Sequence, residues 1–552
     1  MKTTHTARDY DLILIGSGMG ALTVASLMAQ LRGKRILVLE RHFRAGGFTH
    51  AFSRKNFHWD VGVHYIGQMG EGGSIRSLFD LITGKGVQWS KMPEPFEKFV
   101  YPNLKFDLYG DKKRFIADLV QLFPAEEKAI RQYFQDISKA STALFFHTMR
   151  QNGTPVFKLV GWLGKFWNSI SLDLTTKEYL DSHFQNPQLK ALLVSQWGTY
   201  GLPPAQSPFV MHATIVNHYL QGGYYPVGGA GNIADSVQSI VESKGGKFLI
   251  NREATEILRD RGEVAGVRVR KVNTPNKDEF EEYYAPVVVS NVGAANTYLK
   301  LIPPDYPIPF RQSLAEFVRQ HPPATNVMVY LGLKDDPRKL GFHGENHWIY
   351  EQFDHDAIYE QRSSWIKNGQ PVQAYISFPS LKDPQAKTHT AEILTFADYD
   401  TFISWQNQQW RHRDTEYKAL KQHISQTLID LVNKHYPGFA DIVDYVEVST
   451  PLTNEYFTAH PQGGIYGLSF KSERFQPENL PWTKVKTPLP GLYLTGVDIY
   501  MGGIVPAVMS GVMTTSNLPD GISIPQAFAM AAKANRGAGE QGNIKMKSIV
   551  ES

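Results

Sequence analysis

The sequence predicts an α/β protein in which a Rossmann-type dinucleotide-binding domain is interleaved with a second domain of mixed sheet and helices. Three observations predict this class. Residues 11–47 combine an apolar strand, a glycine turn, a helical pattern, a second strand and an acid. Residues 490–515 repeat the order strand, glycines, helix near the other end. A chain of 552 residues is also too long for one simple core, so two interleaved domains are expected.

The first unit is a strand that runs into a glycine-rich turn. Residues 12–15 are uniformly apolar, and residues 16–21 read GSGMGA. In such a turn Gly16 permits the tight bend, Gly18 lets the backbone approach a pyrophosphate, and the small Ala21 allows close helix packing. Gly20 is an additional glycine in the same turn. Phosphates then meet the free amides at the helix N-terminus.

The second strand of this unit, residues 36–39, stops on Glu40. A carboxylate about twenty residues beyond the glycine turn can accept hydrogen bonds from ribose hydroxyls. The same carboxylate would repel a 2′-phosphate, which argues against NADP at this site. The alternative, an ordinary strand-to-helix turn, is less favoured because strand, helix and acid all fall where a dinucleotide needs them.

Two further motifs follow the acid. Residues 41–48 read RHFRAGGF, and residues 57–67 read FHWDVGVHYIG. With these motifs the chain resembles the phytoene desaturase, carotenoid isomerase and retinol saturase family of flavoproteins, and most closely its retinol saturase branch. The resemblance implies an FAD-binding domain of the amine oxidase/phytoene desaturase type. It implies that Gly46 and Gly47 follow the diphosphate and ribityl chain, that Gly62 lies in a segment near the isoalloxazine, and that Arg41 also binds the cofactor.

Composition narrows the functional classes. With 42% apolar and 20% charged residues the chain is typical of an ordinary folded protein. Its net charge of +4 gives no reason to expect nucleic acid as a partner. Cysteine is absent, which excludes disulfides, thiolate metal sites and a cysteinyl link to a flavin, and no metal site is predicted.

Targeting signals are not evident in the sequence. The first ten residues lack the apolar core of a signal peptide. No apolar run reaches the roughly 18 residues that suggest a transmembrane helix. We therefore expect a cytoplasmic protein, with peripheral membrane attachment as an open alternative.

The chain leaves the first part of the cofactor domain, residues 1–100, for a helical insertion at 101–221. Within it, residues 156–170 form an amphipathic helical pattern, with two tryptophans on the apolar face and lysines beside them. That pattern suits a membrane interface, and a core helix is the alternative. The apolar face comprises Leu159, Trp162, Leu163, Phe166, Trp167 and Ile170.

Residues 222–300 are predicted to return to the cofactor domain. Residues 222–232 read GGYYPVGGAGN and resemble a segment of the same family. A second dinucleotide fingerprint is not favoured there, because no buried strand leads into it. A hairpin follows at 246–269, and the resemblance implies that the backbone of Ala254 binds the adenine.

Residues 301–480 are predicted to form the substrate-binding mixed sheet with helices, and residues 481–518 the last part of the cofactor domain. The resemblance implies that Asp498 bonds the ribityl chain and that the amides near Gly503, Ile504 and Val505 face flavin N1 and O2. The positive end of a helix would stabilise reduced flavin there. Asp498 as a simple helix cap is the alternative. Residues 519–552 are expected to be a poorly packed, flexible tail.

The resemblance implies hydride exchange between flavin N5 and a carbon of a conjugated polyene. The expected activity is a saturase acting on a retinoid, a carotenoid-like isoprenoid or an unsaturated acyl chain. A desaturase, a cis–trans isomerase and a lipid carrier without turnover remain alternatives. His64, Tyr65 and Tyr500 are the candidates for handling the proton, although each could instead only pack against the ring. Because one dinucleotide site is predicted, electrons should come from an external donor, NAD(P)H or a reductase partner.

Overall fold

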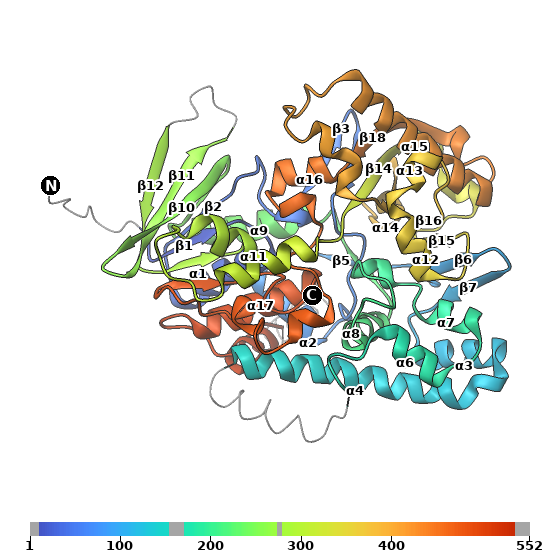
Figure 1. The fold of residues 1–552 in the computed structure, drawn as a ribbon, viewed down its shortest axis with the longest axis horizontal. Coiled ribbons are helices and arrows are strands. Elements are labelled where there is room, and N and C mark those ends of the chain that lie inside the picture. Colours follow the sequence, from blue (N-terminus) through green and yellow to red (C-terminus); the bar gives the residue numbers. More distant parts are fainter. Residues whose placement is uncertain (1–9, 154–169, 273–278, 536–552) are drawn as a thin grey trace, which may run out of the picture.

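The computed structural model describes residues 10–153, 170–272 and 279–535. These residues form a five-stranded sheet, a seven-stranded sheet, a separate three-stranded sheet, two small two-stranded sheets and a helical layer (Figure 1). The predicted α/β class, a Rossmann-type domain interleaved with a mixed sheet and a helical insertion, is confirmed.

The five-stranded sheet is parallel throughout, in the order β19-β13-β1-β2-β9. All residues of β1 and β2 are buried, as expected for strands covered by helices on both faces. Helix α1 packs against α9 and α17. The elements of this domain are β1 (Leu12–Ile15), α1 (Met19–Arg32), β2 (Ile36–Leu39), α2 (Ser74–Ile82), α9 (Gly231–Ser243), β9 (Lys247–Leu249), β13 (Val288–Ser290), β19 (Leu492–Leu494) and α17 (Ile504–Asn517).

The seven-stranded sheet has the order β18-β14-β17-β16-β15-β6-β7 and is antiparallel except between β15 and β6. The hairpin β6–β7 precedes the helical layer in the sequence but belongs to this sheet. The predicted boundary at residue 100 therefore falls inside this hairpin. The other predicted boundaries stay predictions. The strands are β6 (Glu97–Tyr101), β7 (Leu104–Leu108), β14 (Asn326–Leu333), β15 (Asn346–Tyr350), β16 (Gln373–Ser377), β17 (His389–Phe396) and β18 (Val443–Ser449).

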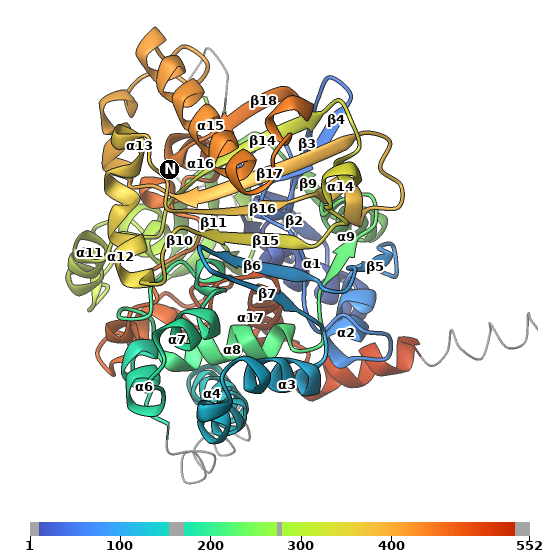
Figure 2. The same cartoon turned by 90° about the vertical axis from the view of Figure 1, so that its right-hand side faces the viewer.

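The two faces of this sheet meet different neighbours. One face packs against α15 (Thr415–His435), and the core there includes Ile393, Leu428 and Val432. The other face packs with the helical layer, which extends beyond the β7 edge (Figure 2). That layer consists of α3 (Lys112–Leu122), α4 (Glu127–Asn152), α6 (Thr176–His183), α7 (Pro187–Leu193) and α8 (Phe209–Tyr219).

Smaller elements complete the chain. The hairpin predicted at 246–269 is present, with its first strand divided, and β12 extends it into a three-stranded antiparallel sheet. The remaining named strands and helices are β3 (Ala51–Arg54), β4 (Phe57–Asp60), β5 (Trp89–Lys91), β8 (Tyr224–Pro226), β10 (Arg252–Asp260), β11 (Glu263–Lys271), β12 (Phe280–Tyr284), α10 (Ala294–Asn296), α11 (Arg311–Gln320), α12 (His355–Glu360), α13 (Trp365–Asn368), α14 (Pro379–Lys382) and α16 (Pro451–Thr458).

Two predicted segments are the tail from residue 519 and the amphipathic helix at 156–170. The expectation of a poorly packed tail from residue 519 is wrong for its first part, because residues 524–535 are helical and bury Ile524, Ala527 and Ala531 in the core. The predicted amphipathic helix at 156–170 lies, apart from its last residue, outside the described residues. Its membrane role therefore stays a prediction.

Candidate active site

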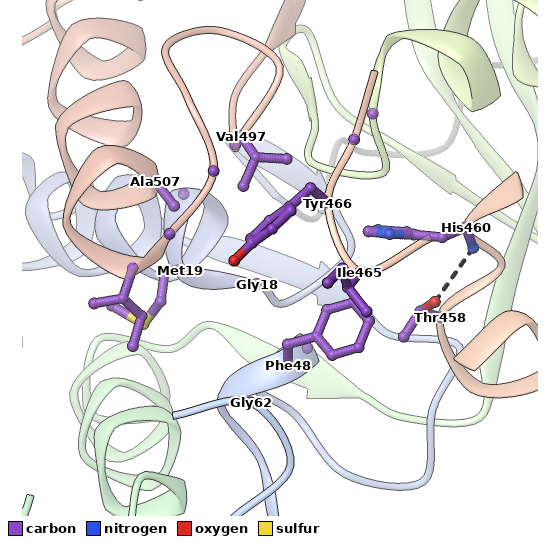
Figure 3. A pocket seen from close by; sticks show the side chains of 18 of the residues that line it. Gly18, Met19, Phe48, Gly62, Thr458, His460, Ile465, Tyr466, Val497 and Ala507 are labelled. Atoms are coloured by element: carbon purple, nitrogen blue, oxygen red, sulfur yellow. Dashed lines mark hydrogen bonds between the residues drawn. The ribbon is translucent and has the colours of Figure 1, made fainter. Parts of the chain in front are cut away.

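One cavity of about 920 Å³ is lined by both the parallel sheet and the seven-stranded sheet. Figure 3 shows side chains from three separate segments, Phe48, Tyr466 and Val497, around the same space. Of the predicted site residues, Ala21 is the exception and is fully buried on α1, where its small side chain suits close helix packing. The others line the cavity: Gly16, Gly18, Gly20, Glu40, Arg41, Gly46, Gly47, Gly62, His64, Tyr65, Ala254, Asp498, Tyr500, Gly503, Ile504 and Val505.

The glycine turn and the glycine pair pack directly against each other. A Cβ atom at Gly47 would lie 3.2 Å from Gly18 Cα, and one at Gly18 would lie 2.6 Å from Asn291 Nδ2. The Gly46 amide donates a hydrogen bond to the Ser17 hydroxyl at 2.9 Å. Helix α1 begins here without a side-chain cap and without an acid in its first turn. Its first amides are therefore available to an anion in the cavity.

Glu40 is buried at the end of β2 and ties that strand to the glycine turn. One carboxylate oxygen accepts hydrogen bonds from the Ser17 amide at 2.9 Å and the Ser17 hydroxyl at 2.5 Å. The other oxygen accepts from the His42 amide at 2.7 Å. Burial raises the pKa of the Glu40 carboxyl, and these hydrogen bonds oppose the rise. Glu40 therefore shapes the turn as well as lining the cavity.

Arg41 fixes the strand that carries Ala254. Its Nε donates to Glu253 Oε1 at 2.9 Å, and its guanidinium also donates to the Tyr456 carbonyl. Glu253 precedes Ala254 on β10. The ion pair thus holds the backbone of Ala254 at the cavity beside the end of β2.

Asp498 follows β19, the edge strand on the other side of the parallel sheet from Glu40, and its carboxylate joins segments that are distant in the sequence. Its two oxygens accept from the amides of Ala294 and Leu468, each at 2.7 Å, and the Arg474 guanidinium lies 3.8 Å away. Helix α17 starts after Gly503 with no side-chain cap. Asp498 is therefore not the cap of α17, and its predicted contact with a ribityl chain stays a prediction.

The three proton-handling candidates are in different environments. His64 Nδ1 lies 2.9 Å from Glu392 Oε2, and burial lowers the pKa of His64 to about 3. Burial raises the pKa of the Tyr65 phenol, and the buried carboxylate of Glu97, which accepts a hydrogen bond from the Tyr65 hydroxyl, raises it further. Tyr500 is half-buried, and burial raises its pKa. The structure brings all three to one cavity, but two of them are coupled to carboxyls that the sequence did not single out.

An apolar row crosses four strands of the seven-stranded sheet and faces the cavity. Met328 pairs with Leu394, Leu394 with Tyr375, and Tyr375 with Trp348, so these side chains share one face. All four line the cavity, and Ile215 of α8 lines it as well. This apolar row is the part of the site suited to a long apolar ligand.

A polar row lies two residues along the same face. Tyr330 pairs with Glu392, and Glu392 pairs with Ser377, whose hydroxyl accepts a hydrogen bond from Lys382 at 2.6 Å. Glu392 and Lys382 are both buried. Sequence reasoning missed this polar row. The available signal was Glu392 itself, a single charge between apolar residues in the run 391–394.

In residues 10–153, 170–272 and 279–535, no helix is long and apolar enough to cross a membrane. The same described residues contain no group of three or more histidines and carboxylates placed to hold a metal ion.

The chain is similar to several known proteins. Residues 14–81 match the model of the NAD(P)-binding Rossmann-like domain. The chain is 32% identical to the all-trans-retinol 13,14-reductase of Danio rerio, covering 97% of this chain and 90% of that protein. It is 26% identical to prolycopene isomerase 1 of an Oncidium hybrid cultivar, covering 92% and 83%. An oxidoreductase structure from Methanosarcina mazei aligns with a TM-score of 0.59 at 16% identity, covering 90% and 99%, and shows the fold alone. The chain therefore belongs to the all-trans-retinol 13,14-reductase family of oxidoreductases.

Proposed function

We propose that the protein binds FAD in this cavity and reduces one carbon–carbon double bond of a conjugated apolar substrate. The class of substrate is a retinoid, a carotenoid-like isoprenoid or an unsaturated acyl chain. The observation that carries the proposal is that one cavity continues from the glycine turn at Gly18 to the apolar row at Trp348 and Tyr375. The name of the 32% identical relative, a retinol reductase, supports saturation as the direction.

The residues present fit a flavin dinucleotide. The cradle between Gly18 and Gly47 is one that a Cβ atom would fill. Two helices, α1 and α17, direct uncapped N-termini at the cavity, which suits a diphosphate at one and negative charge at the other. The Glu40 carboxylate suits ribose hydroxyls. When bound, FAD supplies reversible hydride transfer.

The chain's own residues then have separate tasks. The glycine turn holds the diphosphate and the Ala254 backbone holds the adenine, while Asp498 and residues 503–505 hold the other end of the cofactor. The apolar row excludes water and fixes the double bond, because positioning supplies most of the rate when a neutral alkene offers little charge to bind. His64 is the group we assign to the proton.

Electron supply is assigned to an external donor. The chain contains one glycine fingerprint with its strand, helix and acid, and in this proposal FAD occupies it. NAD(P)H bound transiently, or a reductase partner, would then deliver the electrons. The apolar substrate would reach the protein from a membrane surface, to which residues 156–170 would attach the protein. The protein itself would be cytoplasmic.

Isomerisation is the second candidate, favoured by the similarity to a prolycopene isomerase. The same site would then change double-bond geometry without net reduction. A desaturase would run the reaction toward oxidation, and a lipid carrier would bind the same ligands without turnover.

The test separates these outcomes by product mass. Bound flavin is photoreduced without oxygen, and retinol, carotenoids and polyunsaturated fatty acids are added one at a time. We expect flavin reoxidation with a product two mass units heavier. Unchanged mass with altered double-bond geometry would indicate an isomerase, and a product two units lighter, formed only with oxidised flavin, a desaturase. Binding without any turnover would indicate a carrier.

A further inference from the structure

We propose that Glu392, a buried residue of the polar row, replaces the proton that His64 gives to the substrate, and that the buried Lys382 stabilises the negative charge this leaves on Glu392. This inference rests on the proposed reduction, because adding two hydrogens to a double bond requires a proton as well as a hydride. Glu392 and Lys382 are positioning residues that act through His64, which lines the cavity.

The geometry around His64 separates its two ring nitrogens. Nδ1 lies 2.9 Å from Glu392 Oε2, and the Glu392 side chain is fully buried. The His64 side chain is 15% exposed, toward the cavity that it lines. Among the described residues no hydrogen bond is formed by Nε2. Nδ1 thus faces the buried Glu392, and Nε2 is the ring nitrogen that can contact a ligand in the cavity.

Lys382 is the cation at the centre of the polar row. Its Nζ donates to Ser377 Oγ at 2.6 Å, to Asn346 Oδ1 at 2.5 Å and to the His64 carbonyl at 2.9 Å. All three acceptors are neutral, so these contacts fix the ammonium without neutralising it. Burial lowers the pKa of Lys382 to about 7, and the nearby carboxylates, Glu392 foremost, oppose this fall, so the charge on Lys382 depends on them.

Two buried carboxyls compete for negative charge beside His64. Burial raises the pKa of Asp60 to about 7, and the hydrogen bonds that its carboxyl accepts from the Tyr225 hydroxyl and, at 2.8 Å, from the Ala230 amide oppose this rise. Glu392 faces a ring nitrogen that can accept as well as donate. Burial raises the pKa of Glu392 to about 8. At neutral pH we therefore assign the proton to Glu392, which donates it to His64 Nδ1 and leaves the ring hydrogen on Nε2.

The transfer step balances without charging the imidazole. The His64 Nε2–H bond breaks as a C–H bond forms on one alkene carbon, while the adjacent carbon receives the hydride of the proposed reaction. The Glu392 O–H proton moves to Nδ1 in the same step. His64 is neutral before and after, and the negative charge ends on Glu392, where the Lys382 ammonium stabilises it. Uptake of one proton from water at His64 Nε2, with return of the Nδ1 proton to Glu392, restores both groups.

This arrangement predicts a pH dependence with a definite sign. The titratable groups facing His64 are Glu392 on β17, Lys382 on α14, Asp60 on β4 and Tyr375 on β16, whose ring lies 5.1 Å from that of His64. Above about pH 8 Glu392 is ionised and has no proton to pass on. Turnover should therefore fall as the pH rises through that value.

Glu392→Gln is the primary test. The amide keeps the size of the side chain and can donate to Nδ1, but it cannot release a proton. We expect kcat to fall by about 10²- to 10⁴-fold with FAD content and KM unchanged. The matched control is Glu345→Gln, which alters an equally buried carboxyl that pairs with Lys98 at 2.8 Å and with His347 rather than with His64. Near-wild-type turnover of Glu392→Gln would overturn the inference.

A second variant tests Lys382 through the pH profile. Lys382→Met removes a cation that lowers the pKa of Glu392. The alkaline fall in turnover should therefore move to higher pH, by about one unit, besides a lower kcat. A merely structural role would reduce activity without moving the pH profile, and that result would contradict the assignment of Lys382.

Thermal stability gives a readout that needs no turnover. Because folding raises the pKa of Glu392 from 4.5 to about 8, the wild-type carboxyl destabilises the fold increasingly from pH 4.5 up to about 8. Glu392→Gln removes this penalty, so its Tm relative to wild type should rise between pH 5 and pH 8 by a few degrees. A difference in Tm that does not change with pH would overturn the assignment of the proton. If the wild type reduces none of the substrates, the proposed function has failed, and with it the proton transfer to a substrate, whereas this measurement still decides whether Glu392 holds the proton.

Discussion

The two halves of the cavity are built from different parts of the polypeptide. At the parallel sheet the lining is rich in glycines and backbone amides beside a few side chains such as Glu40 and Asp498, with two uncapped helix N-termini directed inward. At the seven-stranded sheet it consists of side chains from alternate strand positions, the apolar row and, from the polar row beside it, Tyr330. A substitution at a glycine leaves the backbone amides in place but adds a side chain where none fits. A substitution in the apolar row instead changes the apolar area of one side chain in steps. Substitutions should therefore act as all-or-none changes in the first half and as graded changes in the second.

The largest effect is expected from Gly18→Val. A Cβ atom at this position would lie 2.6 Å from Asn291 Nδ2, in the cradle assigned to the diphosphate. We expect complete loss of bound flavin, measured by visible absorbance of the purified protein and by FAD released on acid denaturation.

The control for this change is Gly33→Ala at the other end of α1. Gly33 has a φ of +64° and open space around its Cα. The variant should lose about 1 kcal/mol of stability and keep its flavin. Stoichiometric FAD in Gly18→Val would remove the basis for assigning the diphosphate to this turn.

A graded effect is expected from Leu394→Ala in the apolar row. Leu394 lines the cavity between Met328 and Tyr375, and truncating it removes part of the roughly 1.5–3 kcal/mol that a buried leucine side chain contributes. The KM for the conjugated substrate should rise about tenfold with kcat unchanged, as for loss of uniform binding. Steady-state kinetics at fixed donor concentration measure both constants.

The neighbouring Ile393 provides the matched control. It is fully buried in the core on the α15 side of the same sheet. Ile393→Ala should lower the free energy of unfolding by about 2–5 kcal/mol and leave KM unchanged. If the two alanine variants raised KM equally, the distinction between the two faces of the sheet would fail.

The same contrast explains how much the sequence could predict. The dinucleotide half depends on residues close together in the chain, Gly16 to Glu40, so strand, turn and acid could be placed in order. The apolar row joins Met328, Trp348, Tyr375 and Leu394 through strand pairings that one sequence does not specify. Glu392 gains its partner His64 from 328 positions away.

The incorrect prediction for the tail has a related cause. Residues 524–535 are rich in alanine, and their small side chains give little hydrophobic periodicity. In the structure Ala527 and Ala531, four residues apart on one helical face, are fully buried. Close packing of small side chains contributes to a core without producing a strong sequence pattern.

The smallest effect is expected from the pH dependence of stability in the helical layer. His212 of α8 is fully buried, and its Nε2 lies 2.7 Å from the Tyr133 hydroxyl of α4. Burial lowers the pKa of His212 to about 3. The pKa values of His355 and His218, which also lie among the residues around the helical layer, are lowered to about 3 and about 4. Acid should therefore loosen the packing around the helical layer.

The sign follows from comparing the folded chain with the unfolded chain. A histidine with an ordinary pKa of 6.5 takes up a proton in the unfolded chain below that pH, whereas folded His212 stays neutral until about pH 3. Stability is unaffected above pH 6.5 and falls as the pH drops below it, by about 1 kcal/mol at pH 5.5 for this one group. His212→Gln should therefore lose about 1 kcal/mol less than wild type between pH 7.5 and pH 5.5, measured from denaturant midpoints. Tyr133→Phe, which removes the hydrogen-bond partner but keeps the buried imidazole, should be less stable at both pH values with the wild-type pH dependence. If His212→Gln kept the wild-type dependence as well, the acid sensitivity would have to arise outside this pair of helices.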